Sequence, residues 1–332
     1  MSELALAAFA AASNAHVVSR PRERRFARFV AAFDERGYRS DLERRGIRFL
    51  ARSDAAFPPL LAAIHDPPAG LFVRGCADLA LLGRPAVAMV GARACSAYGR
   101  GVARMLGREL ASAGLVVVSG LARGVDGEAH RGALEAGGST VAVLGCGIDR
   151  DYPAAHRRLA AEIAGSGIGL VVSEYAPGVE PAPWRFPARN RIVSGLAAAT
   201  VVLEAREGSG ALITADFALE EGREVLAVPG EITSSLSAGS NGLLRLGATP
   251  LTRSDDVLEL FGLEATKAEP EVVGAAAQAV LERLQEESRG ADALGRATGL
   301  GAGEVAAALA ELELAGLVAE DAGVYRGVMP PG

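Results

Sequence analysis

Residues 85–99 read PAVAMVGARACSAYG, and this stretch decides the fold class. A five-residue apolar run, Ala86–Val90, comes directly before a glycine turn and the start of a predicted helix. The run is too short for a buried helix, so it predicts a strand. Because every residue in it is apolar, we expect both faces of the strand to be buried, as in a parallel sheet that helices cover.

More runs of this kind follow, separated by segments long enough for one helix each. Right-handed crossovers between such strands give an extended Rossmann-like, doubly wound and mostly parallel sheet, which is an α/β fold. Ligands on these sheets bind where the strands end and the helices begin. The further runs are Leu115–Ser119, Thr140–Leu144, Gly169–Ser173, Thr200–Glu204 and Val225–Val228.

The strand ends carry glycines, hydroxyl side chains and arginines. Glycine lets the backbone approach a ligand closely, and a helix N-terminus offers free N–H groups to an anion. This pattern predicts a long groove that follows a chain of phosphates, although turn geometry and helix capping would also account for these residue types. The candidate residues are Gly91, Arg93 and Ser96 after the first strand, Ser119, Gly120, Arg123 and Gly124 after the second, and Ser209, Gly210 and Thr214 after the fifth.

The stretch WRFPARNR at residues 184–191 contains three arginines, two aromatic residues and an asparagine. Arginine binds phosphates through two parallel hydrogen bonds, and an aromatic face stacks on an unpaired base. This combination favours a single nucleic-acid strand over a small metabolite. The alternative is a surface loop with a buried phenylalanine and solvated arginines. The candidate contacts are Arg185, Phe186, Arg189, Asn190 and Arg191.

Composition limits the kind of site that can exist. The net charge of −6 argues against binding of nucleic acid by overall attraction, so such a site must be a local arginine patch. Three widely spaced cysteines indicate neither a disulfide framework nor a metal site. No apolar run reaches the ~18 residues that a membrane span needs, and the default expectation is the cytoplasm.

Signatures of nucleotide enzymes are missing from the strand ends. Neither G-x-G-x-x-G nor the P-loop motif follows a strand, which disfavours a dinucleotide cofactor and a P-loop ATPase.

Asp126 and His130 could pair on a helix, but no third ligand has a recognisable spacing, so capping and a hydrogen-bonded histidine are favoured. Glu174 and Glu204 stand where a general base could, yet a helix N-terminus or an arginine would also explain them. Cys95 has no activating base nearby in sequence. We assign no catalytic residue, metal or cofactor.

The first 84 residues differ in character from the block at 85–253. Residues 1–52 read as a helical segment with an arginine cluster from Arg20 to Arg28. A solvated helix face and a nucleic-acid contact both fit this cluster, and the solvated face is favoured. Residues 53–84 read as a proline-rich connector with a short strand near Leu71–Val73.

The C-terminal part begins with an acidic linker at 254–274. Residues 275–328 then show three helices and a hairpin, which is the winged-helix pattern. The third helix carries Glu304, Glu311 and Glu313 and no basic residue. Carboxylates repel a phosphate backbone, so we expect this module to contact protein rather than duplex DNA.

These motifs, in this order and spacing, resemble those of the DNA-processing protein A (DprA/Smf) family over about half of the chain. Any one of them alone would be weak, whereas the set is specific. They are V-G-x-R-x-x-S-x-Y-G at 90–99, S-G-L-A-x-G-[IV]-D-x-x-A-H at 119–130, G-x-G-I-D-x-x-Y-P at 145–153, Ser173-Glu174, F-P-x-R-N-R at 186–191, S-G-x-L-I-T-A at 209–215, V-P-G at 228–230, S-x-G-x-N-x-L at 237–243 and Gly247-Ala248.

The resemblance implies a protein that binds single-stranded DNA without sequence preference. It also implies a homodimer that loads the RecA recombinase onto incoming strands in natural transformation. Carried over by position, Arg93, and Phe186 with the arginines beside it, are the expected strand contacts. The chain departs from the family pattern at Pro183, where a basic residue is expected, and Arg185 is the candidate substitute.

An enzymatic alternative comes from a second likeness. The "lonely guy" phosphoribohydrolases have a similar architecture and hold a nucleotide phosphate on a P-G-G-x-G-T-x-x-E loop. The corresponding residues 208–214 read GSGALIT, without the second glycine pair and the following glutamate. This difference disfavours hydrolysis of an N-glycosidic bond.

Overall fold

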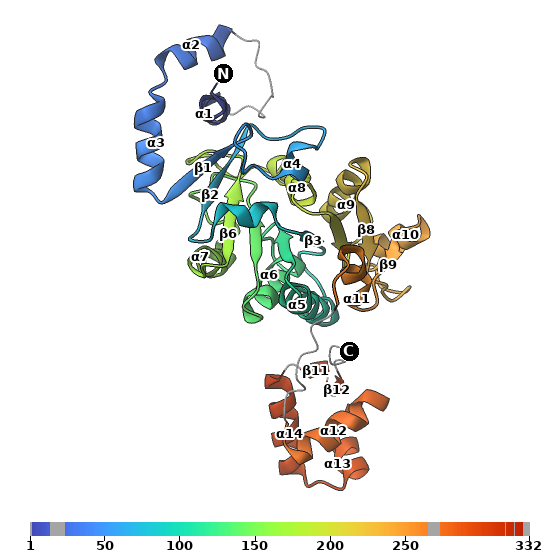
Figure 1. Ribbon diagram of the computed structural model, residues 1–332. Coiled ribbons are helices and arrows are strands. Elements are labelled where there is room, and N and C mark those ends of the chain that lie inside the picture. The colour runs from blue at the N-terminus through green and yellow to red at the C-terminus, as the bar shows by residue number, and fades with distance from the viewer. Residues whose placement is uncertain (1, 14–23, 265–272, 316, 322, 328–332) are drawn as a thin grey trace. The chain divides into compact units, whose positions relative to one another are not determined.

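The computed structural model describes residues 2–13, 24–264, 273–315, 317–321 and 323–327 (Figure 1). Two compact units divide the chain after Glu264. Arg20 and Arg22 of the expected arginine cluster, and residues 265–272 of the expected linker, lie outside the described residues.

The first unit is built on a nine-stranded sheet with the order β1-β2-β6-β5-β4-β3-β7-β8-β9. Strands β3 to β9 all run parallel, which confirms the predicted mostly parallel α/β fold. The strands are β1 (Ile47–Ala51), β2 (Gly70–Arg74), β3 (Ala86–Val90), β4 (Val116–Ser119), β5 (Thr140–Val143), β6 (Gly169–Ser173), β7 (Ala199–Val202), β8 (Glu224–Ala227) and β9 (Thr249–Pro250).

The order of the strands reverses at β3. From β3 the chain builds β4, β5 and β6 on one side, and it then returns to place β7 on the other side of β3. The crossovers diverge at such a reversal and leave a crevice at the carboxyl ends of the strands, where ligands bind. The fold therefore provides one preferred ligand position, between the ends of β3 and β7.

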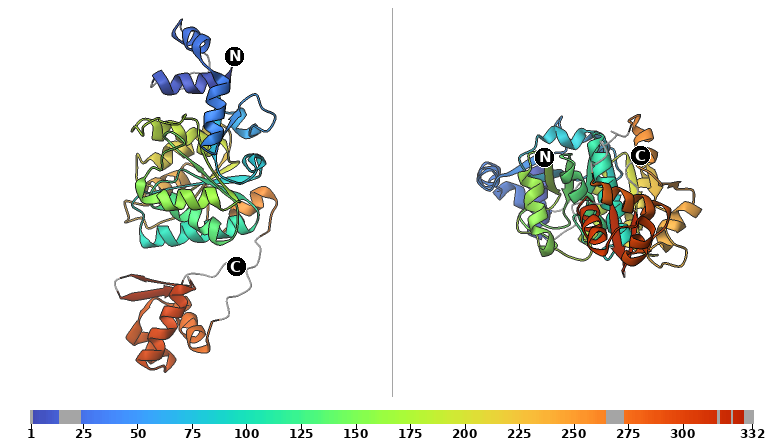
Figure 2. Two further views of the ribbon diagram at one scale, coloured as in Figure 1. Left: turned by 90° about the vertical axis from the view of Figure 1, so that its left-hand side faces the viewer. Right: turned by 90° about the horizontal axis from the view of Figure 1, so that it is seen from below.

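Helices cover both faces of the sheet, as apolar strands require (Figures 1 and 2). Val141 and Val143 of β5 belong to the core beneath one layer, and Ala142 between them belongs to the core of the opposite face. The layers contain α4 (Pro59–Ala62), α8 (Arg185–Gly195) and α9 (Gly210–Glu220) on one face, and α5 (Ala97–Ser112), α6 (Val125–Glu135) and α7 (Arg157–Gly165) on the other.

The sheet extends beyond the expected block at 85–253. Strand β2 pairs with β6 and β1 pairs with β2, both antiparallel, so residues 53–84 are not merely a connector. The expected linker begins with helical turns, α11 (Asp255–Leu258) and η3 (Glu259–Phe261), in which Val257 is fully buried. The remaining elements of this unit are α1 (Glu3–Ser13), α2 (Arg24–Ala32), α3 (Glu35–Arg44), η1 (Leu79–Gly83), η2 (Ala154–His156) and α10 (Ala238–Arg245).

The second unit is the winged-helix domain. It packs its three helices around a core that includes Leu281, Leu294 and Leu309. Of the glutamates on its third helix, Glu304 accepts a hydrogen bond from the Gly301 amide and Glu311 from the Gly274 amide. Its elements are α12 (Ala275–Glu286), β10 (Arg289–Gly290), α13 (Ala291–Thr298), α14 (Ala302–Leu314), β11 (Val318–Asp321) and β12 (Val324–Gly327).

None of the helices in the described parts of the chain is both long and apolar enough to cross a membrane.

Candidate nucleic-acid interface

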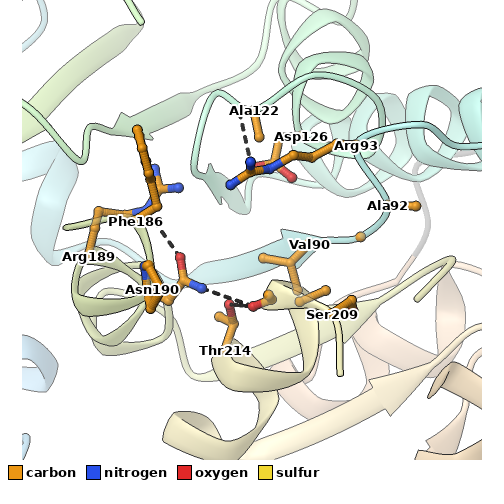
Figure 3. A pocket seen from close by; sticks show the side chains of 14 residues that line it. Val90, Ala92, Arg93, Ala122, Asp126, Phe186, Arg189, Asn190, Ser209 and Thr214 are labelled. Atoms are coloured by element: carbon orange, nitrogen blue, oxygen red, sulfur yellow. Dashed lines mark hydrogen bonds between the residues drawn. The ribbon is translucent and has the colours of Figure 1, made fainter. Parts of the chain in front are cut away.

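A pocket of about 380 Å³ lies at the point where the strand order reverses (Figure 3). A volume in this range accommodates a small ligand, of the size of one nucleotide. Four separate segments meet there, each at the end of a strand or the start of a helix. The lining residues are Val90, Gly91, Ala92 and Arg93 after β3, Ala122 and Asp126 after β4, Phe186, Pro187, Arg189 and Asn190 on α8, and Ser209, Gly210, Ala211 and Thr214 at the start of α9.

Phe186 stands at one side of this pocket with an aromatic neighbour. Its ring stacks on Tyr152, with centroids 5.0 Å apart and planes inclined by 28°. The guanidinium carbon of Arg93 lies 5.7 Å from the Phe186 ring centroid. Tyr152 is 44% exposed, so part of the stacked pair is open to solvent. A cation beside an aromatic platform is the arrangement that holds single strands in other folds.

Arg189 is buried and held rigidly. Its Nη1 donates to the carbonyls of Gly120, at 2.6 Å, and Val143, and its Nε donates to Asn190 at 3.2 Å. Burial lowers the pKa of Arg189, and the Asp126 carboxylate opposes this. A Cβ on residue 120 would come within 2.6 Å of the Arg189 guanidinium, so only glycine leaves room for it. Gly120 therefore positions Arg189, rather than offering its own amide to a phosphate.

Asp126 closes the floor of the pocket. It accepts hydrogen bonds from the amides of Gly120 at 3.0 Å and Ala122 at 3.2 Å. Burial raises the pKa of Asp126, while Arg189 and these two amides act in the opposite direction. The carboxylate braces the turn after β4 rather than capping the start of α6, where no side-chain cap is present.

The turns after β3 and β4 pack directly against each other. Gly124 has a φ of +75°, and a Cβ there would lie 2.2 Å from the Ala92 carbonyl. Leu121 adopts a φ of 57°, which non-glycine residues rarely do, and its carbonyl contacts His156 Nδ1 at 3.0 Å. Gly124 thus joins the two turns that carry Arg93 and Arg123.

The start of α9 lines the pocket. Asn190 Nδ2 donates to the Gly210 carbonyl at 2.9 Å and ties α8 to this turn. The Thr214 hydroxyl bonds back to the same carbonyl at 3.4 Å. Ser209 makes no side-chain cap on α9. The N-terminal dipole of α9 is therefore available to an anion in the pocket.

The start of α5 is closed in a different way. Glu204, from the end of β7, accepts hydrogen bonds from the Ser96 amide at 2.7 Å and from the Ser96 hydroxyl, which in turn caps the Gly99 amide. A carboxylate already occupies the place that a phosphate would take. The expectation that Ser96 cradles a phosphate is therefore wrong, and Glu204 is a capping group rather than a base.

Ser119 is also a structural residue. It is fully buried, and its hydroxyl donates to the Met89 carbonyl at 2.6 Å. This bond joins β4 to β3 beneath the pocket, so the expected phosphate contact is wrong for Ser119 as well.

All three arginines expected to face the strand are buried, and two of them do not line the pocket. Arg191 forms a two-pronged ion pair with Glu174, at 3.1 and 2.7 Å, and a second one with Asp66 at 3.1 Å. Burial opposes the charge of Arg191, but these carboxylates outweigh it and raise the pKa. Arg185 donates to the Glu180 carbonyl and lies 5.3 Å from the Tyr175 ring centroid. Both residues hold α8 in place and do not line the pocket.

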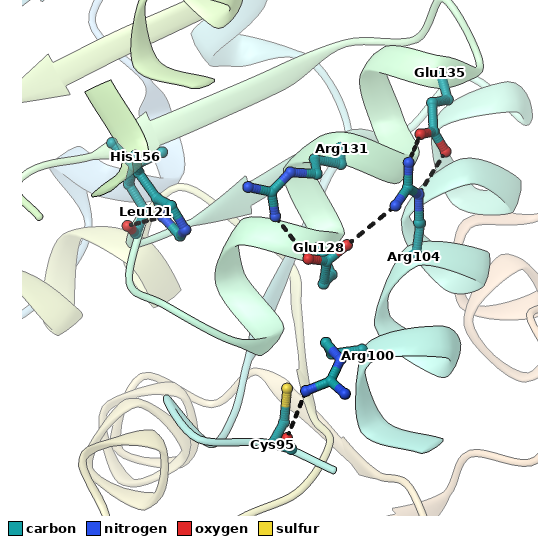
Figure 4. A network of polar contacts seen from close by, with 8 residues as sticks. All are labelled: Cys95, Arg100, Arg104, Leu121, Glu128, Arg131, Glu135 and His156. Carbon is teal, nitrogen blue, oxygen red and sulfur yellow. Dashed lines mark hydrogen bonds and ion pairs between the residues drawn. The ribbon is translucent and has the colours of Figure 1, made fainter. Parts of the chain in front are cut away.

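Arginines on the outer surface of α5 and α6 are largely neutralised (Figure 4). Glu128 pairs with Arg131 at 2.6 Å and with Arg104 at 3.5 Å, and Arg104 also contacts Glu135. Arg123 is exposed at the tip of the turn between β4 and α6. Arg93 is likewise exposed, and it lines the pocket.

The other polar candidates have no sign of catalytic activation. Burial lowers the pKa of His130 to about 3, and its Nδ1 contacts the Thr140 hydroxyl at 2.7 Å. Burial, followed by the Glu204 charge, raises the pKa of the Cys95 thiol. Across the described ranges, no three His, Cys, Asp or Glu side chains are grouped to hold a metal.

Tyr152 is the residue of the pocket edge that the sequence did not single out. It stands in the G-x-G-I-D-x-x-Y-P run, at the residue before Pro153. That run ends a loop after β5, far in sequence from Phe186, so its stacking partner could not be identified from spacing.

Known proteins resemble the chain over both units. Residues 48–262 match the family described as DNA recombination-mediator protein A, and residues 264–323 match the DprA winged helix domain. Protein Smf of Escherichia coli is 39% identical over 295 residues, covering 86% of this chain and 78% of that protein. DNA processing protein DprA of Streptococcus pneumoniae is 46% identical over 208 residues, covering 63% and 72%.

Solved structures agree with this assignment. The X-ray structure of DprA from Streptococcus pneumoniae superposes with a TM-score of 0.67 at 37% identity, covering 79% of this chain and 93% of that chain. A structure concerned with single-stranded DNA binding by DNA processing protein A of Helicobacter pylori gives a TM-score of 0.59 at 31% identity, covering 66% and 97%. The chain belongs to the DNA recombination-mediator protein A family, the family of DprA and Smf.

Proposed function

We propose that this protein binds single-stranded DNA without sequence preference, protects incoming strands and helps load RecA in natural transformation. The observation that carries the proposal is the convergence, in one pocket, of Arg93, the stacked Phe186–Tyr152 pair and the open N-terminus of α9. One phosphate fits between Arg93 and the start of α9, and one base fits against the stacked rings.

The lack of sequence preference follows from how the pocket's polar side chains are used. Asn190 donates to Gly210 and accepts from Arg189, and Asp126 accepts from two backbone amides. These two side chains, which could read the edge of a base, are already hydrogen-bonded within the protein. Stacking and phosphate contacts remain, and these tolerate any base.

The proposed partners are RecA and a second copy of the chain, and the proposed compartment is the cytoplasm. Support for a protein interface comes from large apolar side chains on the last helices of the sheet. Leu219 on α9 is 55% exposed and Leu246 after α10 is 87% exposed. Light scattering of Leu246→Glu should give a monomer if the homodimer uses this surface.

Fluorescence anisotropy with labelled oligo-dT tests the binding site. Arg93→Ala should lower the slope of log K against log salt by about 0.7, the value for one phosphate contact on a single strand. Arg253→Ala is the matched control, because Arg253 is exposed and paired with Asp256 away from the pocket. An unchanged slope for Arg93→Ala would contradict the proposed site.

Two further measurements separate this function from its alternatives. A chain truncated after Glu264 should retain oligo-dT binding, because the pocket lies wholly in the first unit. Release of free base from AMP by the purified protein would favour the phosphoribohydrolase alternative instead. The pocket gives that alternative only Asp126 as a lining carboxylate.

A further inference from the structure

Helix α2 carries an unusually one-sided charge. Its nine residues, RRFARFVAA, contain three arginines and no carboxylate. Arg24, Arg25 and Arg28 are all exposed, whereas Phe26 is buried. We call these three arginines the α2 arginine face.

The α2 arginine face lacks a partner among the described residues. Within the described part of the chain, no hydrogen bond or ion pair engages any of its members. The neighbouring helix α3 shows the usual alternative, because Arg39 pairs with Glu35 and Arg44 with Asp41, each at 2.9 Å. The charges of these arginines on α3 are therefore balanced by carboxylates of the same helix, whereas α2 offers no such carboxylate.

Two of the arginines are neighbours on the helix surface. Arg24 and Arg28 are four residues apart, and like charges at this spacing repel each other. An anion bound between them would relieve this repulsion. This is the electrostatic requirement of a phosphate-binding surface.

The aromatic side of α2 excludes two other partners. Phe26 packs edge-on against Phe9 of α1 at 5.2 Å, and Phe29 stacks on Phe33 at 5.2 Å. Because these rings are used within the N-terminal helices, they cannot insert into a lipid surface. They also cannot stack on an unpaired base, which leaves contact with phosphates alone.

We propose that the α2 arginine face is a second nucleic-acid contact and that it binds the phosphate backbone of duplex DNA. Duplex DNA presents one charge per ~1.7 Å of its axis, the densest array of phosphates available to three adjacent arginines. The contact needs neither unpaired bases nor the pocket at the ends of β3 and β7. The protein then holds single-stranded and duplex DNA through different surfaces.

The test compares two triple variants that change the net charge equally. Arg24→Ala/Arg25→Ala/Arg28→Ala removes the α2 arginine face, and alanine preserves the helix. Arg39→Ala/Arg44→Ala/Arg253→Ala removes three exposed arginines that already have carboxylate partners. Anisotropy with a labelled duplex and with a short oligo-dT is measured over a range of salt concentrations.

We expect the α2 variant to lose duplex affinity by about tenfold or more at low salt, and its salt slope to fall by about 0.9 for each phosphate contact removed. Its oligo-dT binding should match that of the wild type, and Arg93→Ala should show the reverse pattern. Absence of duplex binding by the wild type, or an equal loss in the control variant, would overturn the proposal.

A folding defect is recognised by thermal unfolding. Arg28→Glu, which changes one exposed residue only, should reproduce the loss of duplex binding in a fully folded protein. If Arg93→Ala leaves oligo-dT binding intact while the α2 variant still loses duplex binding, the single-strand proposal fails and this one stands.

Discussion

Replacing Phe186 with alanine should weaken single-strand binding without altering its dependence on salt. The ring stands at the pocket with Tyr152 behind it and Arg93 beside it. Loss of one base–aromatic stack costs about 1–3 kcal/mol, which corresponds to roughly a 5- to 150-fold weaker affinity. The substitution removes no charge, so the number of counterions released on binding should stay the same.

The assay is anisotropy with labelled oligo-dT at four or more salt concentrations. Phe186→Ala should shift the whole line of log K against log salt downward in parallel, whereas Arg93→Ala should also flatten it. Phe261→Ala serves as the control, since this residue lies in η3 and is absent from the pocket lining. An affinity within twofold of the wild type, with thermal unfolding unchanged, would refute base stacking on Phe186.

Three further predictions concern the framework of the site. Gly120→Ala should cost about 1–3 kcal/mol in unfolding experiments and also weaken oligo-dT binding, because the new Cβ overlaps the Arg189 guanidinium. Glu174→Ala should lower the unfolding free energy by about 3–5 kcal/mol, because it leaves Arg191 buried with a charge that only the half-exposed Asp66 opposes; the affinity of the folded fraction should not change. The unfolded chain protonates His130 below pH 6.5, but the folded chain does so only near a pKa of about 3. Stability should therefore fall by up to about 1.4 kcal/mol per pH unit as the pH drops through this window, and denaturant titrations of His130→Gln should lack this contribution.

Local patterns in the sequence were sufficient to predict the parallel strands of the sheet. The apolar runs at β3 to β8 are buried on both faces. Strands in this environment consist almost entirely of apolar residues, so they can be recognised in the sequence. Strands β1 and β2 are harder to recognise from composition alone. Their place in the sheet depends on antiparallel pairing of β2 with β6, about a hundred residues away, which no local period encodes.

The arginines of WRFPARNR show why residue type alone misplaced part of the site. Residues Arg185–Gly195 form helix α8 rather than a surface loop. Residues two apart on a helix point about 200° apart, so Arg189 and Arg191 must face opposite sides. Arg189 lines the pocket and Arg191 meets Glu174. Once a helix is assumed, the sequence itself separates these two side chains.

Contacts between segments that are distant in sequence could not be predicted from local patterns. Ser96 and Glu204 are 108 residues apart, and only the adjacency of β3 and β7 brings them together. Their bond closes the start of α5, the position at which many Rossmann-like sheets hold a phosphate. The start of α9, which has no side-chain cap, is the anion site that we propose at this edge.

A net charge of −6 is compatible with a polyanion ligand because charge matters only where it is not already compensated. Three carboxylates of the strand ends and their turns, Asp126, Glu174 and Glu204, each accept hydrogen bonds from backbone amides, a hydroxyl or an arginine. These bonds within the protein reduce the negative potential that the three carboxylates present to a ligand. Arg93 and Arg123 are exposed at the same edge, beside the positive end of α9. If a strand binds at this edge, neutralising Arg93 should reduce binding far more than removing a distant paired arginine of equal charge.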